Sequence, residues 1–555
     1  MKPPIVTTQA GQVQGAWQEK GQIAVFKGIP YAKPPIGDLR WQAPQAVAAW
    51  TGIKKTSAFS ASAWQQGATI HTFFNALMEG QGWGKLRTLS MKAIFKVVPE
   101  PKQSEDCLYL NIRTPQLESA AKLPVMVWIH GGDHQDGSAG EPYYDGNALP
   151  QKGVVTVTIN YRLGLMGYFA HPELTQASDK GVCGNYGTLD QIAALQWIQD
   201  NIAAFGGDAD NVTIFGESAG GESVAHLLSS PLAKGLFHKA ILQSPANSGQ
   251  MIHLFKPFLD HLSGEDMGSR FAKEFGIQGE NQVEQLRKLP AETLQKFVKN
   301  NPEIGSFFPA IDGHVLPKSP FETFFDGEQA KVPVLLGSNA NEGSILHPLL
   351  PAALVEFRFR EMPSNQQPKI FFEEYREEAD QLFALYPGLE KRTTTAESDF
   401  LGDGMFGSKV RFYAEQIAKT GQSAYFYFFT RVPPSTTQTA GAFHAAELPF
   451  VHGTSTPILP LNEQDKQLSA KMIDYWTQFA KTGNPNGNGH PEWENFNPDQ
   501  ARWMQLGTVN LGMTEVEREE KYRLINERTL RHIQAMKALR EIHLAIHSKP
   551  NTTST

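Results

Sequence analysis

The sequence has almost no cysteine. Cys107 and Cys183 are the only two among its 555 residues. Two thiols allow one disulfide at most, which is too few for a disulfide framework. A chain of this length buries enough apolar surface to fold without a disulfide or a metal ion. We therefore expect two free, buried thiols and a reducing compartment.

Long hydrophobic runs are also missing. No stretch of about 18 apolar residues occurs, which excludes a membrane-spanning helix. The first residues, MKPPIVTTQAGQVQG, contain no apolar segment like that of a signal peptide. We predict a cytoplasmic protein, with secretion only if a leader has been removed.

An excess of positive charge is absent as well. The chain has 50 lysines and arginines against 57 aspartates and glutamates, a net charge of −7. This balance argues against a nucleic-acid partner. Internal repeats are missing too, so a repeat architecture is excluded. The composition, 41% hydrophobic and 19% charged, is that of an ordinary globular protein.

What the sequence does contain is a set of short apolar runs rich in β-branched residues. Continuous runs of this kind are typical of strands buried on both faces of a parallel sheet. Between two of them, residues 190–204 (DQIAALQWIQDNIAA) carry apolar side chains at helical spacing. Strand, helix, strand indicates an α/β fold. The candidate strands are residues 22–26, 124–129, 154–159, 212–215, 239–243 and 332–336.

One of these runs leads into a candidate nucleophile. Residues 212–221 read VTIFGESAGG, so Ser218 stands in a G-x-S-x-G pattern after a strand and before a helix start. A serine in such a sharp turn exposes its hydroxyl, and the helix directs N–H groups toward a developing oxyanion. Glycines at 216 and 220 avoid clashes in that turn. The G-x-S-x-G pattern alone also fits a turn whose serine has no catalytic role. Its position between a strand and a helix start favours a nucleophile.

A second glycine turn lies upstream. Residues 128–132 (WIHGG) end a strand in consecutive glycines, the usual place for the other half of an oxyanion hole. Main-chain N–H groups approach a carbonyl oxygen only where side chains are absent or turned away. The two turns together predict a serine hydrolase.

Several blocks of the sequence resemble the type-B carboxylesterase family, which includes cholinesterases and bacterial para-nitrobenzyl esterases. They are FKGIPYAKPPIGDLRW, SEDCLYLNI, VWIHGG, NYRLG, GNYGTLDQIAALQWIQDNIAAFGGDADNVTIFGESAGG, ILQS, LLGSNANEGS, HAAELPFVHG and YWTQFAKTGNPN. The blocks span nearly the whole chain. The resemblance implies an α/β-hydrolase fold, in which helices flank a central, twisted, mostly parallel sheet with lid-like insertions.

The resemblance also implies the rest of a catalytic triad. The family's acid is the glutamate of an N-x-x-E-G block, here Glu342, and its base is the histidine shortly before E-L-P, here His444. From the residues alone, Glu342 is one carboxylate after one strand, and His444 is one of 16 histidines. The order serine, glutamate, histidine agrees with the chain order of this fold. The family's oxyanion donors correspond to the backbone N–H groups of Gly132, Asp133 and Ala219.

The sequence departs from the family pattern at Asp133, where a glycine is usual, and at His134, where an aromatic residue is common. A carboxylate beside an oxyanion is unfavourable unless it points away or pairs, for instance with His134. Either Asp133 alters the rate and the substrate range, or it faces solvent and changes little.

Supporting residues follow from the same resemblance. Glu217 and Ser244 are expected beside the triad, and Arg40 and Glu105 are expected to form a structural ion pair. The family's N-terminal disulfide is not expected, because the segment SASAWQQ lacks a partner for Cys107. This fits an intracellular bacterial member. No metal ion and no cofactor is implied.

We predict one catalytic domain over residues 1–514, followed by a C-terminal helix and a disordered tail over residues 515–555. Residues 62–100 and 345–400 lack a clear family counterpart, and they fit either lids over the site or packed surface excursions. The C-terminal helix is expected to dock on the body, with partner binding as the alternative.

The predicted function is hydrolysis of carboxylic esters by a Ser-His-Glu triad through an acyl-enzyme intermediate. We expect small ester substrates with short to medium acyl or aromatic groups, and a monomer or homodimer. Hydrolysis of amides, lactones or carbonates is the alternative, because the same chemistry serves each. The complete triad argues against a non-catalytic, cholinesterase-like adhesion protein. Cholinesterase activity is not expected, because the aromatic cage that a quaternary ammonium group needs is not evident.

Overall fold

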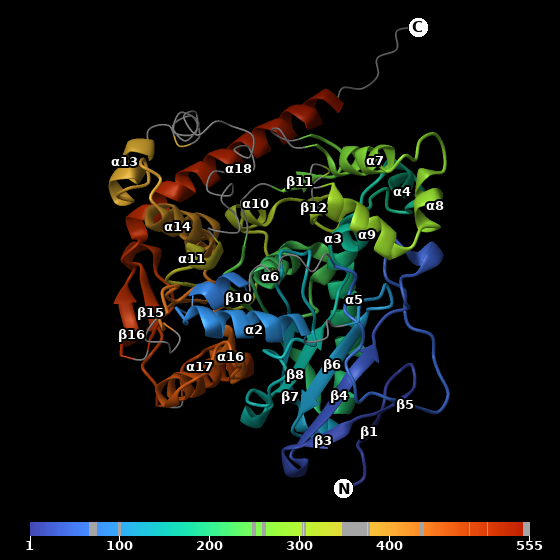
Figure 1. The fold of residues 1–555 in the computed structure, drawn as a ribbon, viewed down its shortest axis with the longest axis horizontal. Helices are drawn as coiled ribbons and strands as arrows, with labels where there is room; N and C mark the ends of the chain where they lie inside the picture. Colours follow the sequence, from blue (N-terminus) through green and yellow to red (C-terminus); the bar gives the residue numbers. More distant parts are fainter. Residues whose placement is uncertain are drawn as a thin grey trace.

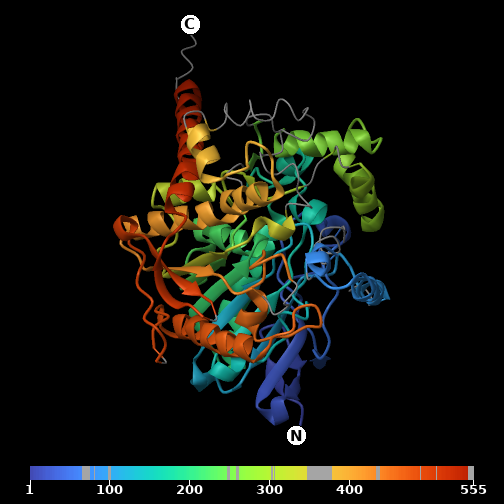
Figure 2. The ribbon, with the colours of Figure 1, turned by 60° about the vertical axis from the view of Figure 1, so that its left-hand side comes forward.

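A sheet of 11 strands runs through the centre of the molecule, and helices pack around it (Figure 1; Figure 2). The computed structural model describes residues 1–65, 75–80, 82–97, 102–246, 251–257, 262–301, 304, 307–346, 375, 378–432, 438–487, 489–507 and 509–547.

The strands of this sheet lie in the order β16-β15-β14-β13-β10-β9-β7-β8-β6-β4-β3. From β15 to β8 every neighbouring pair is parallel, whereas β16, β6, β4 and β3 join their neighbours in antiparallel fashion. The sheet is therefore mostly parallel, as predicted. Its strands are β3 Ala16–Gln18, β4 Ile23–Pro30, β6 Tyr109–Thr114, β7 Leu123–Ile129, β8 Val155–Ile159, β9 Gly207–Glu217, β10 Lys239–Gln243, β13 Val334–Asn339, β14 Ala424–Phe429, β15 Arg502–Leu506 and β16 Leu511–Glu515.

Two smaller sheets and a set of helices complete the fold. The small strands are β1 Ile5–Thr7, β2 Gln12–Gln14, β5 Ile53–Lys55, β11 Ile252–His253 and β12 Ala310–Ile311. The helices are α2 Lys85–Val97, α3 Gly164–Tyr168, α4 Pro172–Ala177, α5 Tyr186–Asn201, α6 Ala219–Ser229, α7 Gly264–Glu274, α8 Gln282–Arg287, α9 Ala291–Asn300, α10 Pro320–Phe325, α11 Gly343–Leu346, α13 Glu378–Leu385, α14 Thr394–Gly402, α15 Ser408–Lys419, α16 Leu448–His452, α17 Glu463–Thr482 and α18 Glu519–His547.

Both faces of the central strands are buried, which explains their continuous apolar sequences. In β7, Val125 and Val127 belong to one hydrophobic cluster, and Met126 and Trp128, which point to the opposite face, belong to another. Helix α5 crosses from β8 to β9, so the predicted strand–helix–strand unit is present. The candidate strands of the sequence all fall within observed strands or overlap them.

The predicted C-terminal helix begins at Glu519 rather than at residue 515. The preceding residues form β16, which pairs with β15 and so remains part of the central sheet. The helix packs against α13 and α15, and Ile525 and Ile533 are buried against the body. The predicted disordered tail after residue 547 lies outside the described residues.

The two segments predicted as lids are described only in part. In the first, Leu77 and Met78 are buried in the body, whereas Leu86 and Leu89 of α2 are 83% and 67% exposed. Residues 66–74, 81 and 98–100 of the first and 347–374 and 376–377 of the second lie outside the described residues. The choice between lid and surface excursion therefore stays a prediction.

Cys107 and Cys183 are both free and buried, as expected. None of the described helices combines the length and apolarity that a membrane span requires.

Candidate active site

Ser218 occupies a sharp turn at one edge of the central sheet. Strand β9 ends at Glu217, the residue before it, and helix α6 begins at Ala219, the residue after it. The serine has φ 57° and ψ −126°, a backbone conformation that side-chain-bearing residues rarely adopt. Its side chain is partly exposed. The turn predicted from the sequence is therefore present, and it presents the hydroxyl to solvent.

The glycines on either side of Ser218 are sterically required. A Cβ atom at Gly216 would lie 2.5 Å from the backbone of Gly220, and one at Gly220 would overlap the carbonyl oxygen of Ile129 at the end of β7. Helix α6 thus packs directly against the ends of two strands. This confirms the reason given for glycine at both positions.

His444 and Glu342 form a buried pair at the same edge of the sheet. The imidazole Nδ1 lies 2.6 Å from Oε2 of Glu342, which follows strand β13 by three residues. The other carboxylate oxygen accepts hydrogen bonds from the backbone N–H of Asn339 at 2.6 Å and from the hydroxyl of Ser244 at 2.5 Å. Two donors and the imidazole therefore fix the orientation of Glu342.

The other nitrogen of His444 faces the residue next to the serine. Its Nε2 lies 3.2 Å from Oε1 of Glu217. This separation is that of an ion pair, but the orientation gives no hydrogen bond, so Oε1 has no hydrogen-bond partner among the described residues. The ring of Phe406 packs on the imidazole with 4.4 Å between centroids. No hydrogen bond between Ser218 and His444 occurs in this structure.

The charges around His444 alter its protonation. Burial lowers the pKa of the imidazole, but the carboxylates of Glu217 and Glu342 outweigh this and raise it to about 9. Burial also raises the pKa of Glu217 to about 8, against the opposing effect of His444. The imidazolium form is thus stabilised by the groups that contact it.

The loop after β7 lies directly against the serine. A Cβ atom at Gly131 would be 2.6 Å from the carbonyl oxygen of Glu217 and 3.1 Å from Cβ of Ser218. The next residues, Gly132 and Asp133, have φ 108° and 57°, and the Gly132 carbonyl accepts two hydrogen bonds from N–H groups further along the loop. The backbone N–H groups of Gly132 and Asp133 donate to no described residue.

Ala219 lies opposite this loop as the first residue of α6, where backbone N–H groups have no partner within the helix. The three predicted oxyanion donors are therefore brought to the two sides of Ser218.

Asp133 is exposed to solvent, as in the second alternative considered from the sequence, although many protein atoms lie around its carboxyl group. Its surroundings raise the pKa of its carboxyl to about 7, first by burial and then by the charges of Glu222 and Asp136. The pairing with His134 considered from the sequence is not seen among the described residues. His134 instead contacts Glu222, with Nε2 3.3 Å from Oε2.

Sequence reasoning missed a buried carboxylate, Glu447, beside the residues of the predicted triad. Glu447 accepts hydrogen bonds from the side-chain amides of Asn339 at 2.7 Å and Gln243 at 3.0 Å. These residues end β13 and β10, so Glu447 ties the segment carrying His444 to two strand ends. The block HAAELPFVHG contains Glu447, but nothing in its spacing indicates that the carboxylate is buried.

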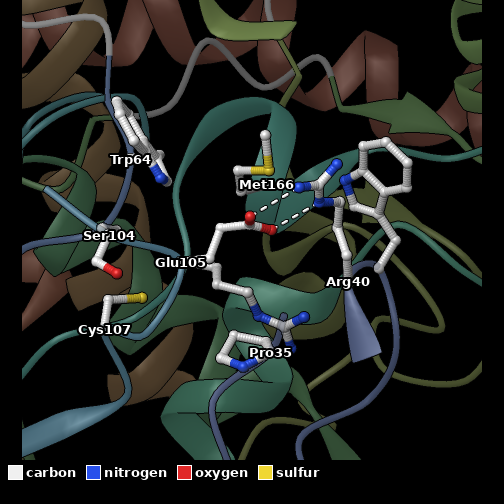
Figure 3. A pocket seen from close by; sticks show the side chains of 10 residues that line it. Pro35, Arg40, Trp64, Ser104, Glu105, Cys107 and Met166 are labelled. Atoms are coloured by element: carbon white, nitrogen blue, oxygen red, sulfur yellow. Dashed lines mark hydrogen bonds and ion pairs between the residues drawn. The ribbon is translucent and has the colours of Figure 1, made fainter. Parts of the chain in front are cut away.

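The predicted ion pair between Arg40 and Glu105 is formed and lines a small pocket (Figure 3). Two of the guanidinium nitrogens donate to the two carboxylate oxygens at 2.6 and 2.7 Å. A third nitrogen donates to the carbonyl of Leu289 at 2.7 Å. The arginine thus joins the N-terminal part of the chain to the segment that follows α8.

The sequence of this chain matches that of known ester hydrolases along most of its length. A sequence model described as the carboxylesterase family matches residues 2–525. The chain is 34% identical to fumonisin B1 esterase of Sphingopyxis macrogoltabida, over 88% of this chain and 84% of that protein. It is 33% identical to para-nitrobenzyl esterase of Bacillus subtilis, over 88% of this chain and 91% of that protein.

Solved structures of ester hydrolases also match this chain along most of its length. A para-nitrobenzyl esterase structure covers 94% of this chain and all of its own, with a TM-score of 0.75 and 31% identity. A carboxylesterase from Geobacillus stearothermophilus covers 94% of this chain and 99% of its own, with a TM-score of 0.75 and 29% identity. The chain therefore belongs to the carboxylesterase family and is a carboxylic ester hydrolase with the α/β-hydrolase fold.

Proposed function

We propose that Ser218, His444 and Glu342 are the catalytic triad with which this enzyme hydrolyses esters. The observation that carries the proposal is the buried 2.6 Å pair of His444 and Glu342, whose imidazole faces the residue preceding a serine in a strained turn. Strands β9, β10 and β13 are parallel neighbours, so their carboxyl ends meet at one edge.

In the first half of the reaction, His444 in its neutral form takes the proton of Ser218 while the serine oxygen attacks the ester carbonyl carbon. Glu342 holds the proton on Nδ1, which leaves the lone pair of Nε2 free to act as the base. The negative oxygen that develops accepts hydrogen bonds from the backbone N–H groups of Gly132, Asp133 and Ala219. Preorganised donors of this kind lower the barrier by about 3 kcal/mol each.

In the second half, the tetrahedral intermediate collapses and the C–O bond to the alcohol breaks. His444 returns its proton to the departing alcohol oxygen, and an ester bond to Ser218 remains. Water, deprotonated by His444, then attacks the acyl carbon and releases the carboxylic acid. The serine regains its proton from His444, so the enzyme ends as it began.

Asp133 acts through its backbone in this scheme. Its pKa, raised to about 7, leaves a substantial share of the carboxyl uncharged at neutral pH, and an uncharged carboxyl repels a nearby oxyanion less than a carboxylate does. A non-glycine residue in the oxyanion loop is thereby compatible with the reaction.

The proposed substrates are small esters with short to medium acyl or aromatic groups. The aromatic and methionine residues of segment 62–100 support an apolar pocket. The relative named for para-nitrobenzyl esters supports an aromatic alcohol group.

The substrate class is tested with para-nitrophenyl esters of increasing acyl length, para-nitrophenyl esters with a charged acyl group, and the corresponding para-nitroanilides. We expect kcat/KM to be greatest for short to medium acyl esters and the anilides to be hydrolysed far more slowly. Fastest turnover of charged, polar esters would contradict the apolar pocket, and equal turnover of the anilides would contradict ester specificity.

The environment of His444 predicts a pH effect. Replacing Glu217 by glutamine is expected to shift the acidic limb of the kcat/KM–pH profile to lower pH by about one unit or more. The neutral imidazole is the active base, and Glu217 stabilises the imidazolium and so raises the pKa of His444. Removing that charge lowers this pKa, and the neutral form then appears at lower pH. The measurement is kcat/KM of one para-nitrophenyl ester from about pH 5 to about pH 10.5, so that the range extends beyond the pKa of His444.

The matched control is Glu463→Gln. The Glu463 side chain is 83% exposed and pairs only with Lys466 at the surface, so the acidic limb should not move. An unmoved limb in Glu217→Gln, or one displaced to higher pH, would show that Glu217 does not act on the catalytic histidine.

A further inference from the structure

Two histidines and one glutamate converge behind the oxyanion loop. His134 comes from that loop, and Glu222 and His226 lie one turn apart on the same face of α6. One ligand atom of each residue lies within 4.8 Å of the others. Across the described ranges, this is the one group of three or more His, Cys, Asp or Glu side chains that meets this distance.

Each histidine nitrogen lies about as far from a Glu222 oxygen as neighbouring ligand atoms lie from each other in a tetrahedral metal centre. Oε2 of Glu222 lies 3.3 Å from Nε2 of His134, and its Oε1 lies 3.6 Å from Nε2 of His226. Ligands about 2.0 Å from a zinc ion in tetrahedral geometry are about 3.3 Å apart. The two imidazole rings stack with 5.9 Å between centroids and 21° between planes, and the Nε2 atom of each lies near the Glu222 carboxylate.

His226 supplies an independent indication of a ligand. Its side chain is fully buried, yet neither ring nitrogen makes a hydrogen bond to a described residue. A buried polar group without a hydrogen bond is costly, and native proteins leave few of them. A metal ion bound at Nε2 would satisfy this nitrogen.

The surroundings suit a bound ion in two further respects. Nδ1 of His134 lies 3.5 Å from the hydroxyl of Tyr168, a contact that orients the ring so that Nε2 is directed at Glu222. The Glu222 side chain keeps 18% of its surface exposed, which gives an ion a route to the cluster. Imidazole nitrogens favour zinc over magnesium and calcium, which prefer oxygen ligands.

We propose that His134, Glu222 and His226 form a binding site for one Zn²⁺ ion per chain. The three residues would leave one coordination position for water. The ion would join the loop that carries Gly132 and Asp133 to the helix that begins next to Ser218. Its occupancy would therefore set how firmly the two sides of the oxyanion hole are held together.

The test is Zn²⁺ binding by the full-length protein after removal of metals with a chelator. Calorimetric titration with zinc chloride is expected to show one ion per chain, and thermal unfolding is expected to occur at a higher temperature with Zn²⁺ than without. His226→Gln should weaken binding by at least about 100-fold, since even the loss of a residue that only orients a ligand costs 10- to 100-fold. The rise in unfolding temperature should disappear with it.

Further variants distinguish Zn²⁺ binding at this site from Zn²⁺ binding at other histidines of the chain. His134→Gln removes a ligand from the other element and should weaken binding as His226→Gln does. His444→Gln and His490→Gln disrupt two histidine–carboxylate contacts elsewhere, with Glu342 and with Asp474 of α17, and should keep wild-type affinity. Absence of Zn²⁺ binding by the wild-type chain, unchanged binding in His226→Gln, or loss of binding in His444→Gln would each overturn the proposal.

Discussion

Ser218→Ala is expected to lower kcat for a para-nitrophenyl ester by about 10⁵- to 10⁶-fold, with little change in KM. The alanine removes the oxygen that forms the acyl-enzyme, and no other hydroxyl occupies the turn between β9 and α6. The oxyanion N–H groups belong to the backbone and stay in place, so a small residual rate above that of water is expected. Steady-state kinetics and a check for loss of the initial burst measure the effect.

The matched control for this variant is Ser229→Ala. Ser229 ends the same helix, and its hydroxyl donates only to the carbonyl of Ala225 one turn earlier. Its replacement should leave kcat within about a factor of two and unfolding nearly unchanged. If Ser218→Ala kept more than a few per cent of wild-type activity while folding normally, another residue would have to be the nucleophile.

Glu342→Gln is expected to lower kcat by about 10⁴-fold, because it imposes the wrong tautomer on the catalytic histidine. The position of Oε1 is held by the N–H of Asn339 and the hydroxyl of Ser244. The Asn339 group is a backbone donor and cannot become an acceptor, so the glutamine must turn its carbonyl oxygen toward it. The NH₂ group then faces Nδ1 of His444, which becomes an acceptor, and the proton moves to Nε2.

A histidine protonated at Nε2 cannot take the proton of Ser218, which accounts for the size of the expected loss. Ser244→Ala is the informative comparison. It removes one donor to Glu342 and keeps both the charge and the Asn339 hydrogen bond, so the loss should stay below about 100-fold. Equal losses in Glu342→Gln and Ser244→Ala, or more than a tenth of wild-type activity in Glu342→Gln, would contradict this account.

The sheet and the sharp turn that carries Ser218 were predictable because their signals are local. Continuous apolar runs such as 124–129 indicate burial on both faces, and the structure places them in parallel strands. Gly216 and Gly220 flank Ser218 within five residues, and the steric reason for them holds in the structure. The order of serine, glutamate and histidine along the chain was available through family resemblance, and the pairing of Glu342 with His444 agrees with it.

Element boundaries were less predictable, because they depend on pairing partners. The C-terminal helix begins four residues later than expected, since residues 511–515 add β16 to the edge of the sheet. Strand β13 extends to Asn339, beyond the apolar run, because it is paired along its length with β14. That extension brings Asn339 within hydrogen-bonding distance of both Glu342 and Glu447.

The sequence by itself determined which backbone turn carries the serine, because a sharp turn needs particular residues at adjacent positions. Only the tertiary structure decided what surrounds the reacting groups. Three contacts illustrate this. The ring of Phe406 packs on His444, Glu447 accepts hydrogen bonds at the ends of two strands, and His134 contacts Glu222. The residues that meet in these contacts are from about 40 to more than 200 positions apart in the sequence. Contacts of this kind arise from how loops pack on the sheet, and no local pattern specifies them.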